Sequence, residues 1–450
     1  MSIQEVNEFT KTFLHKLFVS QNATGNVAIC GLSLYVLLGA INIGLRGSAH
    51  DQLSHFLGEN FDEDFYDENW QDSRTAKRWA DLGDLISEFY YKHSSVHHSC
   101  DINDRYEDVS TSMFRLFKYK VNFLDPGTAA KNLNELILKK AIGPRPNIFD
   151  ESMIRENELI FIDSVMISMP WKSPFDTSLT KQEPFYDNQG QSLDVAMMIE
   201  QKMNLIYDSP NLNCRILFKR FHNKNQYAVI VLPRAGHKIQ DLLKDFKFDE
   251  MKIYFDASQR KYVKFAMPKF KILGPHDLVN TFKSFGLTDM FDPLRSDFGR
   301  MTDQKVFIGK FIQVIHIDIR ESGVSREIDG CSDDDSILGE EDDGEDIEEI
   351  TLSEPEDQNE EDDRSSTNFD SEDDGDVEPS QTSEIEDEDE PSILPSDRES
   401  EDDEDPGDEP HGDPEQFLVN RPFIFLMYAS KEDVVFYRAV VTNPNAALIQ

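Results

Sequence analysis

The chain has 450 residues, of which 87 are acidic and 45 basic, and its formal net charge at pH 7 is −42. It contains no apolar run of about 18 residues, so the sequence predicts no membrane-spanning helix. Its four cysteines have no regular spacing, which argues against a disulfide framework and against a zinc site.

The amino-terminal region has apolar residues at helical spacing. This spacing predicts an amphipathic helix that includes Val6, Phe9, Phe13 and Leu17. A short buried strand is expected at residues 26–29. The nearly all-apolar stretch that follows, residues 33–44, predicts a helix inside the core.

Residues 59–110 are polar, aromatic and poorly periodic, so we expect a solvated loop there. His93, His97 and His98 fall in this stretch. No second set of ligands with a recognisable spacing accompanies them, so we expect no metal site.

From residue 121 onward, β-rich runs of strand length dominate the sequence. They alternate irregularly with helical text, which predicts an α+β fold with large, mostly antiparallel sheets. The expected strands are 159–162, 228–232, 263–267 and 306–319, and the expected helices are 129–141 and 277–286.

Residues 329–416 form an acidic run that carries almost all of the net charge. They hold 42 acidic residues and two basic ones, which leaves 45 acidic and 43 basic residues elsewhere, a balance of −2. So many like charges with so few apolar side chains cannot bury enough surface to offset the chain entropy. We therefore predict that this run is disordered.

Residues 417–450 contain two strand-like runs separated by a polar turn. An isolated pair of strands is marginal in water, so these residues are expected to complete a sheet that begins earlier in the chain. The predicted organisation is one domain made of residues 1–328 and 417–450, with residues 329–416 as a loop inserted into it.

The first residues lack the charge pattern and the apolar core of a secretory signal, so we expect an intracellular protein, in the cytoplasm or nucleus. The glycosylation sequon at Asn22 supports the extracellular alternative. The phosphate-loop, dinucleotide, Gly-x-Ser-x-Gly and His-Glu-x-x-His motifs are all absent, which argues against an enzyme and against a cofactor.

Several local patterns, in one order, resemble the serpin family of protease inhibitors. Residues 163–175, DSVMISMPWKSPF, are similar to the serpin block Asn-Ala-x-x-Phe-x-Gly-x-Trp-x-x-Pro-Phe. Residues 195–198, VAMM, resemble the serpin pattern Val-x-Met-Met. The likeness continues through residues 267–272 (MPKFKI), 285–291 (FGLTDMF), 317–323 (IDIRESG) and 417–444.

This resemblance implies a serpin-like fold with an exposed reactive loop between Glu321 and Phe417. In serpins, a protease cleaves this loop, and the loop's amino-terminal half then inserts into the main sheet and traps the acyl-enzyme. The acidic run lies within this loop. The resemblance places the loop hinge at Glu321, Gly323, Val324, Arg326 and Ile328, and the reactive bond at Ile337–Leu338.

Inhibitory serpins keep small residues where the loop inserts. Successive side chains of a strand point to opposite faces, so Arg326, Ile328 and Asp334 share the face of Val324. Burying an unpaired charge costs several kcal/mol, so we expect insertion to be slow and the loop to behave as a protease substrate.

A second departure from the family concerns its sheet-opening cluster of two serines, an asparagine and a histidine. The matching positions are Cys30, Ser33, Asp163 and Gln313. These replacements have two interpretations. Either the polar network is lost, and sheet mobility changes with it, or the core has diverged while its polar groups remain satisfied.

The first functional hypothesis is a weak or non-inhibitory serpin, expected to be monomeric, whose acidic loop binds basic proteins and repels nucleic acid and membranes. The alternative is a working inhibitor of a serine or cysteine protease. A functionless, solubilising insertion and weak calcium binding are further interpretations of the acidic run.

Overall fold

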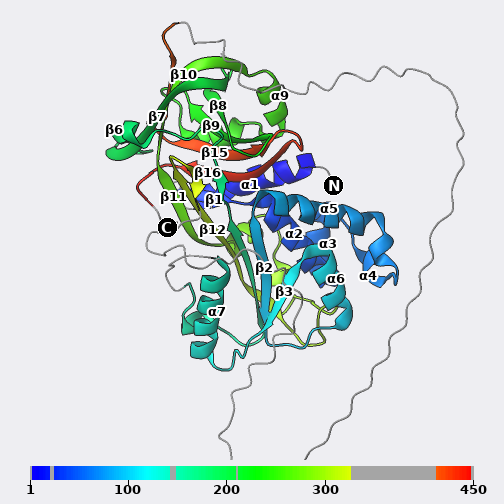
Figure 1. Ribbon diagram of the computed structural model, residues 1–450. Coiled ribbons are helices and arrows are strands. Elements are labelled where there is room, and N and C mark those ends of the chain that lie inside the picture. Colours follow the sequence, from blue (N-terminus) through cyan, green and yellow to red (C-terminus); the bar gives the residue numbers. More distant parts are fainter. Residues whose placement is uncertain (1–2, 21–24, 142–147, 209–210, 326–411, 447–450) are drawn as a thin grey trace, which may run out of the picture. The chain divides into compact units, whose positions relative to one another are not determined.

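A computed structural model describes residues 3–20, 25–141, 148–208, 211–325 and 412–446, without the side chains of residues 3–5 and 138–141. Figure 1 shows the arrangement of its elements. The α-helices are α1 (Ile3–Ser20), α2 (Gly31–Asn42), α3 (Gly47–Leu57), α4 (Asp62–Tyr66), α5 (Arg74–Phe89), α6 (Asp104–Phe114), α7 (Pro126–Ala141), α8 (Ile239–Asp245), α9 (Met251–Asp256) and α10 (Val279–Lys283).

Within the described part of the chain, a seven-stranded sheet has the order β3-β2-β4-β12-β13-β5, with β11 paired to β12. Strand β12 pairs with both β4 and β13, and β13 pairs with β5. Its strands are β2 (Tyr91–His98), β3 (Leu116–Lys120), β4 (Glu158–Met166), β5 (Met169–Pro170), β11 (Phe270–Asp277), β12 (Phe307–Arg320) and β13 (Gly323–Ser325).

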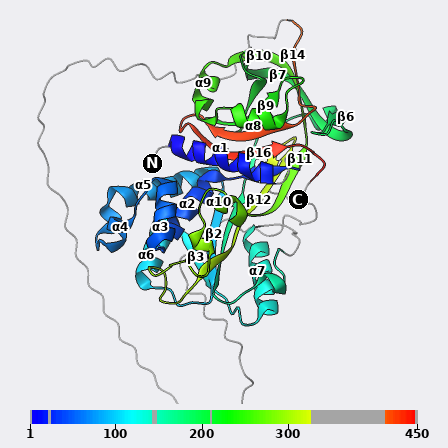
Figure 2. The same cartoon turned by 180° about the vertical axis from the view of Figure 1, so that it is seen from behind.

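A nine-stranded sheet has the order β1-β16-β15-β9-β8-β7-β10-β14, with β6 paired to β7. Seen from behind, α1 runs along its strand β16 (Figure 2). The strands are β1 (Val27–Ile29), β6 (Lys181–Tyr186), β7 (Ser192–Tyr207), β8 (Cys214–Arg220), β9 (Gln226–Pro233), β10 (Gln259–Pro268), β14 (Glu415–Leu418), β15 (Phe423–Ala429) and β16 (Val434–Val441).

The α+β prediction is confirmed, and most strand pairings are antiparallel. The parallel ones are β2 with β3, β4 with β12 and β10 with β14. Every residue of α2 is buried, because its apolar side chains face the core on all sides. The strands expected near residues 159, 228, 263 and 306 are β4, β9, β10 and β12.

The carboxy-terminal runs are strands in the interior of the nine-stranded sheet. Strand β15 pairs with β9, and β16 pairs with β15 and β1. Strand β14 begins at Glu415, so the expected end of the acidic run at residue 416 falls inside a strand. Glu415 and Gln416 lie there because they pair with Val263 and Lys264 of β10.

The prediction of a solvated loop over residues 59–110 was wrong. The structure has α4, α5, β2 and part of α6 there, and Ser73 caps α5 by accepting a hydrogen bond from the amide of Ala76. His93, His97 and His98 are buried on β2. Polar residues hid the strand, because Ser94 and Ser95 are buried on its two opposite faces and Val96 is the one aliphatic residue among its buried positions.

The seven-stranded sheet separates two apolar clusters. On one face, Ile160 and Ile162 of β4 and Ile312 and Val314 of β12 pack with α7. On the other face, alternate residues of the same strands, including Phe161 and Ile315, join the main core. A residue on a strand paired with β12 points to the same face as the β12 residue directly opposite it. The identity of that opposite residue therefore indicates whether the side chain faces α7 or the main core.

Candidate functional site

The first residues of the expected loop hinge, residues 321–324, lie in a short antiparallel hairpin at the end of β12, called the hinge below. In this hairpin, Val324 pairs with Ile319, and Gly323 pairs with Arg320. Strand β13 also pairs on its other side with Met169 and Pro170 of β5. Val324 is only 3% exposed and belongs to the main core, so the first hinge residues are already part of the sheet.

The turn between β12 and β13 is held by backbone groups of the segment after β5. The amide of Trp171 donates to the carbonyl of Ser322 at 3.0 Å, and the amide of Phe175 donates to that of Glu321 at 3.0 Å. The indole Nε1 of Trp171 donates to the carbonyl of Arg320, also at 3.0 Å. These bonds fix the conformation of the turn between β12 and β13.

The carboxylate of Glu321 joins this turn to two other elements. It accepts a hydrogen bond from the hydroxyl of Thr180 at 2.8 Å and pairs with the Lys269 ammonium at 2.8 Å. Partial burial raises the pKa of Glu321, but the hydrogen bonds from Lys269 and Thr180 outweigh burial, so the net shift is downward. The ionised form is therefore the one that holds the hinge.

Gly323 is required by the local backbone. Its φ of +144° is rarely adopted by residues with a side chain. A Cβ at this position would also overlap the carbonyl oxygen of Met169 and lie 2.6 Å from the Cα of Pro170. At Gly323, the backbone of β13 therefore lies so close to the backbone of β5 that only a glycine fits.

A buried ion pair supports residues 173–175, the segment that contacts the turn between β12 and β13. The Lys219 ammonium lies 2.8 Å from the Glu200 carboxylate and donates to the carbonyl of Ser173 at 3.0 Å. It also lies 4.3 Å from the centroid of the Phe175 ring. Burial lowers the pKa of Lys219, and the Glu200 carboxylate opposes this shift. The pair anchors residues 173–175, which in turn hold Glu321.

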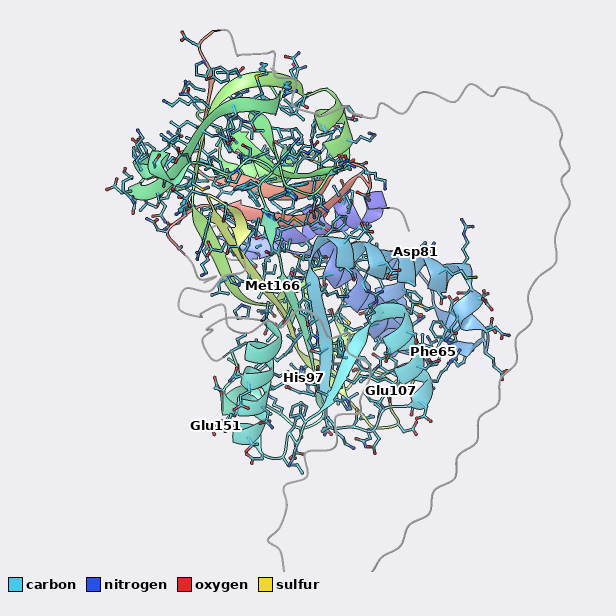
Figure 3. The ribbon with its side chains drawn as sticks, viewed as in Figure 1. Phe65, Asp81, His97, Glu107, Glu151 and Met166 are labelled. Carbon is cyan, nitrogen blue, oxygen red and sulfur yellow. The ribbon has the colours of Figure 1, made fainter. Side chains whose placement is uncertain are left out.

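Strands β4 and β12 are paired directly, so no strand lies between them along their common ladder. The parallel pairing runs from Phe307 opposite Glu158 to His316 opposite Met166. Met166, labelled in Figure 3, marks the end of the ladder on β4. Further insertion of the loop would require this ladder to separate, starting at that end.

The four residues expected to form the sheet-opening cluster do lie together, beneath the β4–β12 ladder. The fully buried Asp163 carboxylate accepts hydrogen bonds from the Ser33 hydroxyl at 2.7 Å and from Gln313 Nε2 at 2.7 Å. The side-chain amide of Gln313 also bonds the backbone of Cys30, accepting from its N–H at 3.2 Å and donating to its carbonyl at 3.1 Å.

A fifth member of the network was missed. The hydroxyl of Ser94, on β2, donates to the Asp163 carboxylate at 2.6 Å. The interpretation that the network is lost was wrong, because every hydrogen-bonding atom of the Gln313 amide and the Asp163 carboxylate accepts or donates here. Cys30 contributes its backbone, and burial raises the pKa of its thiol well above the usual value.

Other predicted site residues lie outside the described part of the chain. These are the hinge residues Arg326 and Ile328 and the proposed reactive bond Ile337–Leu338. The sequence did contain signals for Trp171 and Lys269, because they belong to the serpin-like patterns at residues 163–175 and 267–272. It contained none for Ser94, which becomes recognisable only once β2 pairs with β4.

Among the described residues, no group of three or more histidine, cysteine or acidic side chains is placed to hold a metal ion. No helix in these ranges is both long and apolar enough to cross a membrane.

Comparison with known proteins agrees with this geometry. A family model described as Serpin (serine protease inhibitor) matches residues 4–330. Serine proteinase inhibitor 1 of Vaccinia virus (strain Western Reserve) is 25% identical over 316 residues, covering 68% of this chain and 85% of that protein. Human Serpin B9 is 20% identical over 315 residues, covering 69% and 83%.

Solved structures agree on the fold. Native protease nexin-1 with heparin superimposes with a TM-score of 0.71 at 16% identity, covering 98% of this chain and 99% of that one. A Manduca sexta serine protease inhibitor, serpin-12, gives a TM-score of 0.71 at 14% identity, covering 99% of each chain. The family model, the directly paired β4 and β12, and the hinge beside them lead to one conclusion: this chain belongs to the serpin family.

Proposed function

We propose that this protein is a weakly inhibitory or non-inhibitory serpin whose acidic reactive loop serves as an interaction surface for basic proteins. The proposal rests on two properties of the chain. One is that insertion of the loop would bury the charged side chains of Arg326 and Asp334 on the face of the sheet that packs against the main core. The other is the concentration of negative charge in residues 329–416.

The pairing register between β12 and β13 carries the first part of the proposal. Val324 lies opposite Ile319, so continuing the same antiparallel register would bring Arg326 opposite Ile317 and Ile328 opposite Ile315. Ile317 and Ile315 are fully buried in the main core. An inserted Arg326 would therefore direct its guanidinium into an apolar cluster.

Such an insertion is energetically unfavourable. Burying an unpaired charge costs several kcal/mol, even after local relaxation. Asp334 lies on the same face by parity and would add a similar cost further along the strand. Trapping depends on insertion being faster than hydrolysis of the acyl-enzyme, so a barrier of this size favours release of the protease and a cleaved loop.

The acidic loop is a polyanion both before and after cleavage, and this property carries the second part of the proposal. Forty-two acidic residues in 88 positions produce a strong negative potential, which attracts basic proteins with an affinity that falls as salt increases. Ser332, Ser353, Ser371, Ser383 and Ser400 each have an acidic residue three positions later, so phosphorylation there would increase the charge.

Incubation with a panel of serine and cysteine proteases tests the first part. We expect clean cleavage in the loop, no SDS-stable complex and no increase in the unfolding temperature after cleavage. The Arg326→Thr, Asp334→Ala variant should then gain stability on cleavage. Glu327→Thr is the matched control, because in an inserted strand residue 327 would face away from the main core, so this change should leave the result unchanged.

A working inhibitor is the second candidate, and two observations favour it. Strand β13 is already paired in the sheet. The viral and human relatives also carry inhibitor or serpin names. An SDS-stable complex that accounts for most of the unmodified protein reacted with any protease of the panel would establish this candidate and exclude the first.

Titration with poly-lysine tests the polyanion. We expect tight binding at low salt that weakens steeply as sodium chloride is added, because the contact is electrostatic. A variant lacking residues 332–409 should lose this binding, since the rest of the chain is nearly neutral. Equal binding by the deleted variant would contradict the proposal.

A further inference from the structure

Strand β14, which contains the last two residues of the acidic run, has few backbone and apolar contacts with the sheet. It has four residues and lies at one end of the nine-stranded sheet, where it pairs with β10 in parallel (Figure 2). Of its four side chains only that of Phe417 is buried, with its ring centroid 5.9 Å from that of Phe265. A short edge strand with one buried side chain costs little free energy to open. Contacts beyond this ladder therefore matter for its attachment.

Arg215 of β8 contacts three successive residues of β14. Its guanidinium pairs with the Glu415 carboxylate and donates from Nη1 to the carbonyl of Gln416 at 2.8 Å. It also lies over the ring of Phe417, 5.1 Å from the centroid. In the order of the sheet, β7 and β10 lie between β8 and β14. Arg215 therefore binds β14 independently of the backbone pairing between β14 and β10.

Three further charged groups join this contact, and together the five side chains form what we call the ionic clasp. Asp208, which follows β7, accepts a hydrogen bond from Arg215 Nε at 2.8 Å and also pairs with Arg234. The ammonium of Lys261, on β10, lies 3.1 Å from the second carboxylate oxygen of Glu415. The Arg215 side chain is 19% exposed, whereas those of Glu415 and Lys261 are each 34% exposed. Dissolved salt therefore reaches the outer part of the clasp and screens its charges.

We propose that Arg215 is a positioning residue for the reactive loop: through the ionic clasp it holds β14, and with it the carboxy-terminal end of the loop, on the edge of the nine-stranded sheet. The clasp contains three cations and two carboxylates, so it favours an acidic residue at position 415. Because much of the attachment is electrostatic, it weakens as the ionic strength rises. The clasp acts whether or not the loop is inhibitory, so it does not depend on the function proposed above.

The attachment of β14 decides where the loop ends. While β14 is paired, residues 415–418 follow β10, and the amide of Val419 donates to the carbonyl of Ala266 at 2.9 Å. Release of β14 would add these four residues to the loop and leave the backbone of β10 unpaired on that side. An unpaired strand edge is open to pairing with other strands. The clasp therefore limits the length of the loop and protects the edge of the sheet.

Hydrogen exchange of the β14 amides in the full-length protein tests the proposal, with the amides of β16, in the interior of the same sheet, as the internal reference. Raising sodium chloride from about 50 mM to about 500 mM should speed β14 exchange about tenfold and leave β16 exchange unchanged. Arg215→Met should exchange about tenfold faster than the unmodified protein at low salt and respond little to added salt. A role of Arg215 in packing alone would change the rate of exchange but not its dependence on salt.

A second variant removes the carboxylate from β14 and leaves β8 unaltered. Glu415→Gln should speed β14 exchange as Arg215→Met does. Because both changes break one contact, the double variant should exchange no more than about twofold faster than the faster single variant. Lys264→Met is the matched control: Lys264 lies opposite Gln416 on β10, but within the described residues it forms no ion pair with β14, so its loss should leave β14 exchange unchanged.

The proposal is overturned if β14 exchange is unchanged in both Arg215→Met and Glu415→Gln. It is also overturned if salt speeds β14 and β16 exchange equally, or if Lys264→Met speeds β14 exchange as much as Arg215→Met does. These outcomes are independent of the protease and poly-lysine experiments, so either proposal can fail alone.

Discussion

At the scale of single residues, the hinge depends on one glycine and one carboxylate. Gly323 lets the chain pass close to β5, and Glu321 connects the turn to Thr180 and Lys269. Both lie before the acidic run. They therefore determine the conformation of the turn that precedes the loop.

The Gly323→Ala variant should be destabilised by at least about 2 kcal/mol, because the new methyl group combines a strained φ with overlap of the β5 backbone. Urea unfolding measures this loss. In Gly190→Ala, the control, the φ of +80° is also unfavourable but the Cβ meets no atom within 4 Å, so a smaller loss is expected. Equal losses would show that steric contact with β5 is unimportant.

The pH dependence of Glu321→Gln provides a second test at this scale. The folded-state pKa of Glu321 is lowered, so its charged form stabilises the fold above the unfolded pKa of about 4.3. This contribution is lost as the pH falls through the folded pKa. The variant should therefore be less stable than the unmodified protein at pH 7, and the gap should shrink between pH 5 and pH 3.5. The exposed Glu156→Gln should show no such gap.

At the scale of elements, the essential feature is the direct pairing of β4 and β12. Insertion would place a strand between them and roughly double their separation from about 4.8 Å. The 2.7 Å hydrogen bond from Gln313 to Asp163 cannot survive that change. The network therefore stabilises the closed sheet relative to the open one.

Replacing Gln313 with alanine should destabilise the protein by about 3 kcal/mol, because the Asp163 carboxylate and the Cys30 backbone lose partners in a fully buried site. It should also speed sheet opening, measured by hydrogen exchange of β4 and β12 amides. Gln304→Ala, at an exposed position, is the control and should change stability by less than about 0.5 kcal/mol. Unaltered exchange in Gln313→Ala would contradict a closing role for the network.

At the scale of the whole molecule, charge and fold are carried by different parts of the chain. The acidic run accounts for −40 of the net charge of −42, as 42 acidic against two basic residues. The sheets and helices are built by segments that are close to neutral. The run follows β13 along the chain, and its last two residues, Glu415 and Gln416, belong to β14.

Deleting residues 332–409 should leave the fold intact. Shortening the connection from about 88 to about 10 residues lowers the entropic cost of closing the loop by about 2 kcal/mol, so the free energy of unfolding should rise by up to that amount. Urea unfolding of the deleted and full-length chains measures the difference. A large loss of stability in the deleted chain would mean that the acidic run contributes to the folded domain.

The sequence by itself determined the fold class, the family resemblance and most strands and helices, because apolar periodicity is a local property. It also located Glu321, Gly323 and the residues of the polar cluster. It failed at β2, where histidines and serines are buried, and it could not tell a broken network from a complete one. Only the tertiary structure decided that question. Ser94, Asp163 and Gln313 lie on three different strands, and whether their polar atoms are satisfied depends on strand pairing between residues far apart in the chain.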